Sequence, residues 1–475
     1  MISPSLHPET MAAACEARRR WSFALTGRSM VLLILGFVFI IPGFWESRFS
    51  YGMLAWDALV LLAATLDGLR LPAATDLTAS RAWANAPALD SESEIELTLT
   101  NNGRVILECH LEDDLAPSLS PDSITRRVTA FPHVPEKVRY RIEPQERGDT
   151  EARSLYVRYR SPLGLAERWA RSPLQQTVRV YPALRAGEEQ QIFLARSRQI
   201  DLQLRQARQR GLGRDFESLR EYREGDDLRD ICWTATARRG TPITRQYQTE
   251  RSQAVWIVLD CGRLMRSRVA AVTPGRSAMP SDAPHLRVHS KLDFACTTAV
   301  SLAQLALYSD DRVGLLAYGQ GMQQRILPGR GGAHMRQLIE ALAQVRAESS
   351  EADHLRATAT LNRLQPRRAL ILWITDLAES AMRPEVIDGA VQLLRRHVLL
   401  FVAMAQPEVE LIAGARPKSV EQMFRAAAAQ EMAGRREILL ARLHEQGALT
   451  LNLNPESLTS TVLNQYLTVK ERAIV

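Results

Sequence analysis

Two apolar runs dominate the hydrophobic pattern near the amino terminus, at 30–45 and 51–66. Each run has 16 residues and is separated from the other by five. As helices they would each be about 24 Å long, so the anchors Trp21, Trp45 and Tyr51 are needed to reach across a hydrocarbon core of about 30 Å. The pattern predicts a two-helix transmembrane hairpin at 29–70, preceded by an amino-terminal segment at 1–28.

The basic residues around the runs predict the orientation of the hairpin. The loop between the runs has one arginine and one glutamate, whereas five arginines flank the hairpin outside that loop: Arg18, Arg19, Arg20, Arg28 and Arg70. Because cytoplasmic flanks carry the excess of positive charge, we expect both termini and all later domains on the cytoplasmic side. A cleaved signal peptide is disfavoured, since no small-x-small site follows Trp45. Asp57 should face the first helix or a partner, or else sit shallowly in the membrane.

Alternating apolar and polar residues replace these runs between 71 and 185. Ile95, Leu97 and Leu99 alternate with polar residues, and Val138–Ile142 and Leu155–Tyr159 repeat the alternation. A period of two with short spacings is typical of strands whose one face is buried. We predict an antiparallel β-sandwich of immunoglobulin-like type, acting as a spacer or a protein-binding module.

A polar, charge-rich segment follows at 186–250. Residues 190–210 have the composition of an exposed linker helix, and a second helix is predicted from about Leu228 to Arg239. Gly225, Asp226 and Asp227 would form the turn that caps this second helix, because an aspartate oxygen accepts the free amide hydrogens of a first turn.

The charges in this segment have two interpretations. It is either a docking face for a partner or phosphate-bearing ligand, or an ion-pair clasp between domains anchored by Tyr222 and Trp233. We favour the clasp, because fold-level signatures are often architectural. The arginines involved are Arg220, Arg223, Arg229 and Arg238.

Apolar segments of strand length alternate with helix-like stretches over 251–475. This alternation predicts a parallel sheet covered on both faces, a doubly wound Rossmann-like α/β domain. The strands are expected at 254–259, 313–318, 369–375, 398–404 and 449–453. The helices are expected at 291–308, 334–347, 384–396 and 420–446.

Composition changes this picture little. The 475 residues are 46% hydrophobic and 24% charged, and the net charge of +7 is dispersed rather than gathered into a basic arm. Nucleic-acid binding is therefore not indicated. Five unevenly spaced cysteines without a CxxC pair predict buried reduced thiols. No nucleophile elbow, phosphate loop or nicotinamide fingerprint occurs, so the motifs do not predict an enzyme.

Several segments carry a family resemblance. GLGRDFESLREYREGDDLRDICWTATAR at 211–238, SPLGLAERW at 161–169, VRVYP at 178–182 and the closing segment at 447–472 resemble a family of bacterial membrane proteins with domain of unknown function 58. The resemblance implies a von Willebrand factor A-like core, a place in the bacterial inner membrane and partnership with a MoxR-type AAA+ ATPase. Assembly or activation of envelope or metalloprotein complexes would follow.

In a typical von Willebrand A domain, a DxSxS loop, a threonine and a later aspartate bind magnesium. Here the first loop reads Asp260, Cys261, Gly262, Arg263, Leu264, so glycine and leucine replace both serines. The threonine loop is assigned to 331–333, where Ala333 offers no side-chain oxygen, while Asp376 persists. Two of the five expected ligands remain, so magnesium is disfavoured and no cofactor is expected.

Two carboxylates at strand ends still need compensation if they are buried. One hypothesis is that Arg263 or Arg330 takes the place of the metal ion; the alternative is that Asp260 and Asp376 are solvated and cap the following helices. We expect a membrane-anchored protein-binding scaffold or adaptor. A magnesium-dependent adhesion-type module and an enzyme acting on a small ligand at the Asp260/Asp376 crevice are the alternatives.

Overall fold

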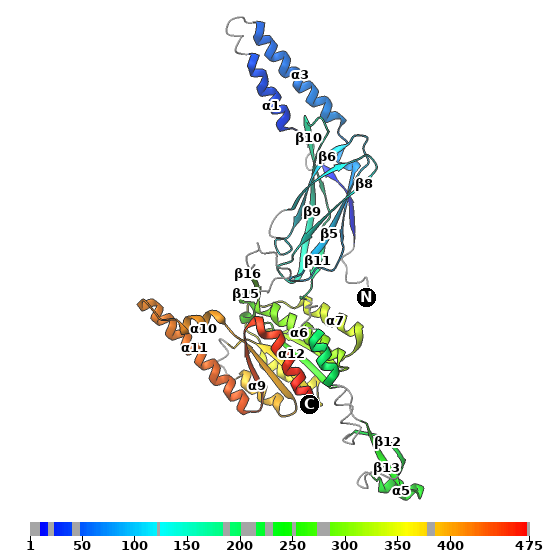
Figure 1. The fold of residues 1–475 in the computed structure, drawn as a ribbon, viewed down its shortest axis with the longest axis vertical. Helices are drawn as coiled ribbons and strands as arrows, with labels where there is room; N and C mark the ends of the chain where they lie inside the picture. The colour runs from blue at the N-terminus through cyan, green and yellow to red at the C-terminus, as the bar shows by residue number, and fades with distance from the viewer. Residues whose placement is uncertain are drawn as a thin grey trace. The chain divides into compact units, whose positions relative to one another are not determined.

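The computed structural model describes residues 10–17, 23–39, 48–120, 124–183, 191–200, 215–223, 231–248, 253–272, 286–377 and 385–472. The chain divides into two compact units, Met1–Ala183 and Leu184–Val475 (Figure 1). All five cysteines fall within the described residues and are buried thiols outside any disulfide bond, as predicted.

Two antiparallel sheets form the β-rich part of the first unit, as the alternating pattern predicts. One sheet has the strand order β1-β4-β5-β8. The other has the order β2-β10-β9-β6-β7, and in addition β11 pairs with β9 and β3 pairs with β10. Burial alternates along all of β5, so Ile95, Leu97 and Leu99 enter a core shared with Leu111 and Val157 of the other sheet. The strands are β1 (Met11–Ala14), β2 (Glu16–Ala17), β3 (Phe23–Leu25), β4 (Leu77–Trp83), β5 (Ser93–Asn101), β6 (Leu107–Leu115), β7 (Ile124–Ala130), β8 (Pro135–Ile142), β9 (Gly148–Arg160), β10 (Ala166–Ser172) and β11 (Gln176–Val180).

The segment before the hairpin contributes strands to these sheets. β1 pairs with β4, and β2 and β3 both pair with β10. The sandwich is therefore not confined to 71–185, and the helices are inserted between its strands β3 and β4. The sequence did not indicate this, because the alanine-rich run at 11–14 becomes a strand through pairing at a sheet edge rather than through intrinsic propensity.

Two helices follow β3: α1 (Gly27–Gly36), continued by the 3-10 turn η2 (Phe37–Phe39), and α3 (Arg48–Arg70). Within the described residues, only 51–70 of α3 is long and apolar enough to cross a membrane. The Trp56 indole donates to Leu32 O at 2.8 Å, so the helices are in contact. A Cβ on Gly36 would lie 2.6 Å from Asp57 Oδ1, which confirms that Asp57 faces the first helix.

The turn at 161–164 holds the ends of both helices. Thr26 caps α1 and donates through Oγ1 to Gly164 O at 2.5 Å. Near the end of α3, buried Asp67 accepts from Ser161 Oγ at 2.6 Å and from Leu165 N at 3.1 Å. The segment at 161–166 thus has a structural task in this chain, because the Ser161 hydroxyl and the Leu165 and Ala166 amides donate to the buried Asp67 carboxylate. The short 3-10 turn η3 (Ala74–Asp76) then leads into β4.

A six-stranded sheet with the order β18-β17-β14-β19-β20-β21 forms the centre of the second unit. All neighbouring pairs are parallel except β17 and β18. The five predicted strands are present; β18, which the alternation of strands and helices did not indicate, is the antiparallel edge. The strands are β14 (Ala254–Asp260), β17 (Arg312–Tyr318), β18 (Met322–Gly329), β19 (Leu370–Thr375), β20 (Val398–Met404) and β21 (Leu449–Leu453).

Helices cover both faces of this sheet (Figure 1). α6 (Lys291–Tyr308) packs between α7 (Gly331–Gln344) and α12 (Pro455–Glu471) on one face. On the other face, α8 (His354–Leu364), α9 (Glu385–Leu394) and the carboxyl-terminal part of α11 (Val420–Glu445) share one core with the sheet. The sequence did not predict α8 or α10 (Pro407–Gly414), the short helix that packs on α11.

The signature segment contains a two-stranded sheet in addition to the predicted helix. β12 (Asp215–Glu221) pairs antiparallel with β13 (Ile243–Gln248), and between them α5 (Trp233–Arg239) begins five residues later than expected and ends at Gly240, whose φ of 72° is left-handed. Residues 191–200 of the expected linker helix are helical.

The side chain of Trp233, one of the two proposed anchors, is 69% exposed, and the clasp between the domains stays a prediction. Tyr222 is half-buried, its N–H donates to Pro242 O at 2.9 Å, and Arg220 donates to Glu221 O at 3.3 Å. Arg238 lies exposed in the last turn of α5. Gly225, Asp226, Asp227 and Arg229 lie outside the described residues.

A two-stranded ladder lies between the strand β14 and the helix α6 in the sequence. β15 (Arg268–Val272) pairs antiparallel with β16 (Leu286–Ser290), after the 3-10 turn η5 (Arg263–Arg266). β16 leads directly into α6 and so fixes where that helix begins.

Candidate binding site at the carboxyl edge of the sheet

Asp260 and Asp376 come together because they end two neighbouring parallel strands. Asp260 is the last residue of β14, and Asp376 directly follows β19. From β14 the chain proceeds to β17 and β18 on one side, then crosses to β19 on the other, so the order of strands reverses between these two. Ligands of doubly wound sheets bind at such a reversal, beyond the carboxyl ends of the strands.

Asp376 is fully buried and surrounded by cationic and polar groups. Its Oδ2 atom accepts from Lys291 Nζ at 2.5 Å and from Gln406 Nε2 at 3.1 Å. On the other oxygen, Oδ1, Arg436 Nη1 approaches to 3.7 Å. Lys291 is 1% exposed, so the short ion pair lies in the protein interior. The charge of Asp376 is therefore compensated from within the chain.

Lys291 is the cation that sequence reasoning missed. It is the first residue of α6, behind the Ser290 cap, where the helix dipole disfavours positive charge. A lysine at the first position of a helix is unfavourable, and this was the sequence signal that could have identified Lys291 as a residue of the site. Burial lowers the pKa of Lys291, and the neighbouring Asp376 carboxylate opposes this change.

Asp260 is also buried, but it is held by neutral donors. Its Oδ1 accepts the Gly262 N–H at 2.7 Å, and its Oδ2 accepts the Thr375 hydroxyl at 2.6 Å. Burial raises the pKa of Asp260, while the nearby His354 and these hydrogen bonds act in the opposite direction. The expectation that both aspartates are solvated helix caps is wrong, because they are only 4% and 0% exposed.

A chain of aromatic side chains leads from the sheet core to the same site. The Trp373 indole donates to the Tyr318 hydroxyl at 2.7 Å, and that hydroxyl lies 2.9 Å from His354 Nδ1. Burial lowers the pKa of His354, with the Asp260 carboxylate opposing. The imidazole is thereby fixed in place beside Asp260 at the start of α8.

The third loop of the site lies at 348–353, not at 331–333 as assigned from the sequence. Glu348 N donates to Cys261 O at 2.7 Å, and Arg263 N donates to Ser350 O at 2.9 Å, so this loop covers the loop that follows β14. Gly331 begins α7 at the opposite edge of the sheet, where Gly329 pairs with Val313 at the start of β17. The misassignment arose because the reversed direction of β18 was not evident from its sequence.

The two arginines proposed to replace the metal ion lie at opposite ends of the sheet strands. Arg330 lies at that opposite edge and pairs with Asp310 at 3.3 Å, so it does not supply the cation at Asp376. Arg263 is on the correct loop and lines the crevice beside Asp260. The short contact to Asp376 comes instead from Lys291.

The crevice itself is a small cavity with a charged rim. Its volume is about 40 Å³. Buried Asp260, His354 and Asp376 line it together with the exposed rim residues Arg263, Glu351 and Glu385. Gly262, Leu264, Ala352 and Val386 complete the wall.

These residues do not fit an octahedral magnesium site. Gly262 and Leu264 offer no hydroxyl, and Lys291 already holds one oxygen of Asp376. In the part of the chain that the structure describes, no three His, Cys, Asp or Glu side chains are placed to share a metal ion.

Comparison with known proteins shows that part of the chain is similar to a family. Residues 218–414 match the family described as "Protein of unknown function DUF58", which supports the resemblance drawn from the signature motif. Two bacterial relatives, "Uncharacterized protein Mb1516" of Mycobacterium bovis and "Uncharacterized protein Rv1480" of Mycobacterium tuberculosis, are each 25% identical over 206 residues. The matched region covers 42% of this chain and 58% of the length of each relative. The chain therefore spans only part of the length of the relatives it matches.

Two solved structures are similar to parts of the chain. One is a conserved hypothetical protein, BatB, from Bacteroides thetaiotaomicron, with 13% identity and a TM-score of 0.28 over 46% of this chain and 100% of that one. The other is an uncharacterized membrane spanning protein from Vibrio fischeri, with 13% identity and a TM-score of 0.17 over 45% and 96% of the two chains. At these scores neither similarity carries an argument about function.

Proposed function

We propose that this chain is a membrane-anchored scaffold whose α/β domain binds a protein partner at the rim of the Asp260/Asp376 crevice without a metal ion. The observation that carries the proposal is the buried Lys291–Asp376 pair at 2.5 Å. The ammonium group of Lys291 takes the position beside the Asp376 carboxylate that a magnesium ion has in an adhesion-type site. The magnesium-dependent alternative therefore loses support.

A von Willebrand A-like assignment fits the sheet. The described strands run parallel with one antiparallel edge, and acidic residues follow the two central strands. A two-helix membrane hairpin is the natural use of α3 together with α1, which contacts it. The arginine distribution then favours the bacterial inner membrane, with the soluble domains on the cytoplasmic side.

The dimensions of the crevice favour a protein partner over a small substrate. A cavity of about 40 Å³ holds water, whereas sites for small organic ligands usually enclose about 300–1,000 Å³. The rim, with Arg263, Glu351 and Glu385 exposed, presents both signs of charge to a partner surface. We propose a MoxR-type AAA+ ATPase as that partner, in assembly or activation of envelope or metalloprotein complexes.

The test measures binding of the full chain in detergent to a purified MoxR-type AAA+ ATPase of the same organism. Reversing the rim with Arg263→Glu and Glu351→Arg should weaken binding at least about tenfold, since opposed charges at an interface fix its register. Arg330→Glu, at the other edge of the sheet, is the matched control and should leave binding unchanged.

Magnesium is tested on this chain alone, because the ATPase itself uses magnesium. We expect the melting temperature to be the same with magnesium and with EDTA. A magnesium-dependent rise that Asp260→Ala abolishes would restore the adhesion-type alternative. No binding of the ATPase by the unmodified chain would remove the proposed partner.

A further inference from the structure

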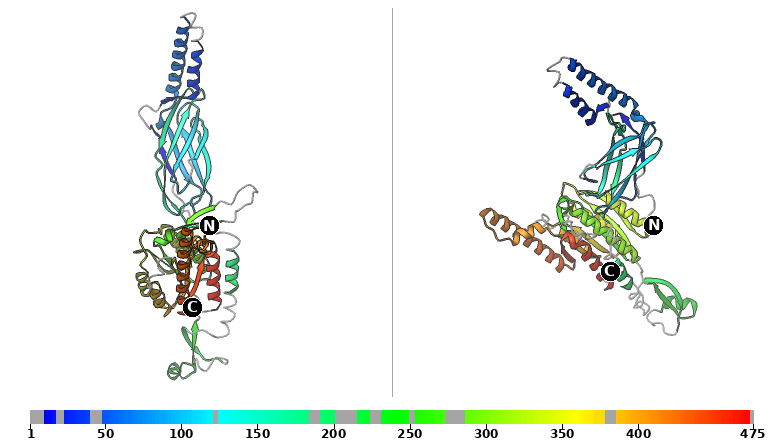
Figure 2. Two further views of the ribbon diagram at one scale, coloured as in Figure 1. Left: turned by 90° about the vertical axis from the view of Figure 1, so that its left-hand side faces the viewer. Right: turned by 45° about the horizontal axis from the view of Figure 1, so that its top comes forward.

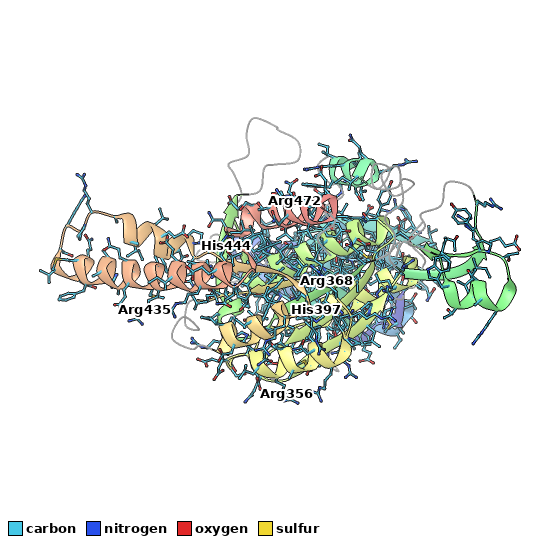
Figure 3. All side chains as sticks on the ribbon, turned by 90° about the horizontal axis from the view of Figure 1, so that it is seen from below. Arg356, Arg368, His397, Arg435, His444 and Arg472 are labelled. Atoms are coloured by element: carbon cyan, nitrogen blue, oxygen red, sulfur yellow. The ribbon has the colours of Figure 1, made fainter. Side chains whose placement is uncertain are left out.

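The amino-terminal part of α11 forms an arm that extends away from the sheet. Leu439, Leu440 and Leu443, near its carboxyl end, belong to the domain core. The part of α11 that precedes these leucines projects away from the sheet, and α10 packs beside it (Figures 2 and 3). Arg435 lies on this projecting part (Figure 3). α10 covers one side of the arm, since Gln430 of α11 donates to Ala413 O of α10 at 2.9 Å.

The side of the arm turned away from α10 is apolar at its centre and charged at both ends. Phe424, Ala428 and Met432 recur every fourth residue, about 120–160° around the helix from Gln430. Phe424 is 68% and Met432 41% exposed. We call this side the outer face of α11; its members are Glu421, Phe424, Arg425, Ala428, Glu431, Met432 and Arg435, all exposed.

The charges of the outer face are self-complementary. Within one helix, Glu421 pairs with Arg425 at 2.7 Å, and Glu431 pairs with Arg435. Ala428 lies seven residues from both Glu421 and Arg435, and three from both Arg425 and Glu431. A two-fold rotation at Ala428 therefore sets each glutamate at the height of an arginine of the other copy.

From this complementarity we propose that the chain forms a symmetric antiparallel dimer through the outer face of α11, with Ala428 at the two-fold axis. In this arrangement Phe424 lies opposite Met432 of the second copy, and the small Ala428 side chains allow the helices to approach closely. Glu421 lies opposite Arg435 of the second copy, and Arg425 opposite Glu431. The apolar centre supplies the binding energy, because exposed ion pairs contribute little.

The charges also select this register over its neighbours. Moving the axis by one residue, to Ala429, sets Arg425 opposite Ala433 and Arg435 opposite Met423 of the other copy, so these charges lose their partners. In a parallel, in-register pairing of the two helices, each charged residue faces the same residue of the other copy. The first arrangement leaves charges without partners and the second places like charges together, so both are less favourable than the register at Ala428.

Cysteine cross-linking of the full chain in detergent tests the axis. The native cysteines are all buried, so Ala428→Cys introduces one accessible thiol. On mild oxidation we expect a covalent dimer from Ala428→Cys. The matched control is Glu437→Cys, an exposed position on the opposite side of the same helix, which should form no covalent dimer. Equal cross-linking of the two variants, or none from Ala428→Cys, would overturn the proposal.

Charge exchange tests the complementarity and separates a second copy from any other partner. One variant carries Glu421→Arg and Glu431→Arg, and the other carries Arg425→Glu and Arg435→Glu. Each variant alone should dissociate at least about tenfold more readily than the unmodified chain, whereas their mixture should form a heterodimer. All four positions are exposed on the arm, and unchanged circular dichroism would confirm folding. If the mixture stays monomeric, or if the unmodified chain is monomeric at all concentrations, the outer face does not bind a second copy.

Discussion

The sandwich and the α/β domain each bury a carboxylate–cation pair, and the two pairs differ in how completely they are satisfied. In the sandwich, Asp113 binds Arg81 through both of its oxygens and also accepts from the Tyr140 hydroxyl. Arg81 in turn donates to Leu174 O at 2.9 Å and to Arg153 O at 3.2 Å. Every part of this network lies within one closed core.

At the crevice, the compensation is unequal between two carboxylates. Asp376 has Lys291, Gln406 and Arg436, whereas the oxygens of Asp260 accept from neutral donors, Gly262 and Thr375. Both aspartates also line a cavity with an exposed rim. A closed, saturated network serves the fold, while a partly compensated one at a sheet edge is the arrangement expected of a binding site.

The largest expected effect comes from breaking the sandwich network. Arg81→Met leaves Asp113 buried without a cation, which should lower the stability of the sandwich by about 3–5 kcal/mol. Pulse proteolysis of the full chain in detergent, across a urea series, measures this loss. Adding Asp113→Leu should recover much of it, because the unpaired charge is then removed. A loss under about 1 kcal/mol in the single variant would show that the network is not the stability element inferred here.

A smaller loss is expected at the crevice. Lys291→Met leaves Asp376 with Gln406 and the more distant Arg436, so we expect a loss of about 2–3 kcal/mol in the α/β domain. The same proteolysis assay, following fragments of the α/β domain, reads it out. Asp376→Asn in the same chain should restore part of the stability, and Lys418→Met, at an exposed position, should have no effect. Equal effects of the two lysine variants would contradict the role given to Lys291.

The smallest effect, and one of opposite sign, is expected at Asp260. Its folded-state pKa is raised by burial, so the folded protein holds a proton that the unfolded chain releases near pH 3.9. Stability from this group is therefore full at lower pH and is lost as pH rises through the folded-state pKa. Asp260→Asn should remove that loss and stabilise the domain by about 1 kcal/mol near neutral pH.

Melting curves of the full chain and the variant between about pH 4 and pH 8 test this sign. The two curves should approach each other at the acidic end and separate as pH rises. If Asp260→Asn destabilises the domain at neutral pH, the carboxylate is better compensated than its contacts indicate.

Much of the fold could be predicted from the sequence where burial is strong and local. Four of the five parallel strands, β14, β17, β19 and β20, are nearly continuous apolar runs, because both of their faces are covered. α6 begins at the predicted residue, Lys291, since Ser290 and Asp293 form a capping box there. In contrast β18 is mostly exposed or half-buried, and its polar sequence carries no such signal.

The candidate site was predictable only in part. The motif identified Asp260 and Asp376 from their places after apolar strands, but the cation came from elsewhere. Lys291 lies 85 residues from Asp376 in the sequence, and Arg436 lies on α11. Neither shares a motif with the aspartate it contacts, so local sequence gave no reason to pair them.

By itself, the sequence determined the apolar segments of the amino-terminal region, the alternating strands of the sandwich, the five parallel strands after residue 251 and the loss of the metal-binding hydroxyls. These are properties of period, capping and residue type, which act over a few neighbours along the chain. Only the tertiary structure decided that strands before α1 join the sandwich, that β18 runs backwards, and that a buried lysine rather than a rim arginine contacts Asp376. Strand direction and charge pairing depend on which segments meet in space, and that is fixed by packing of the whole domain rather than by any local pattern.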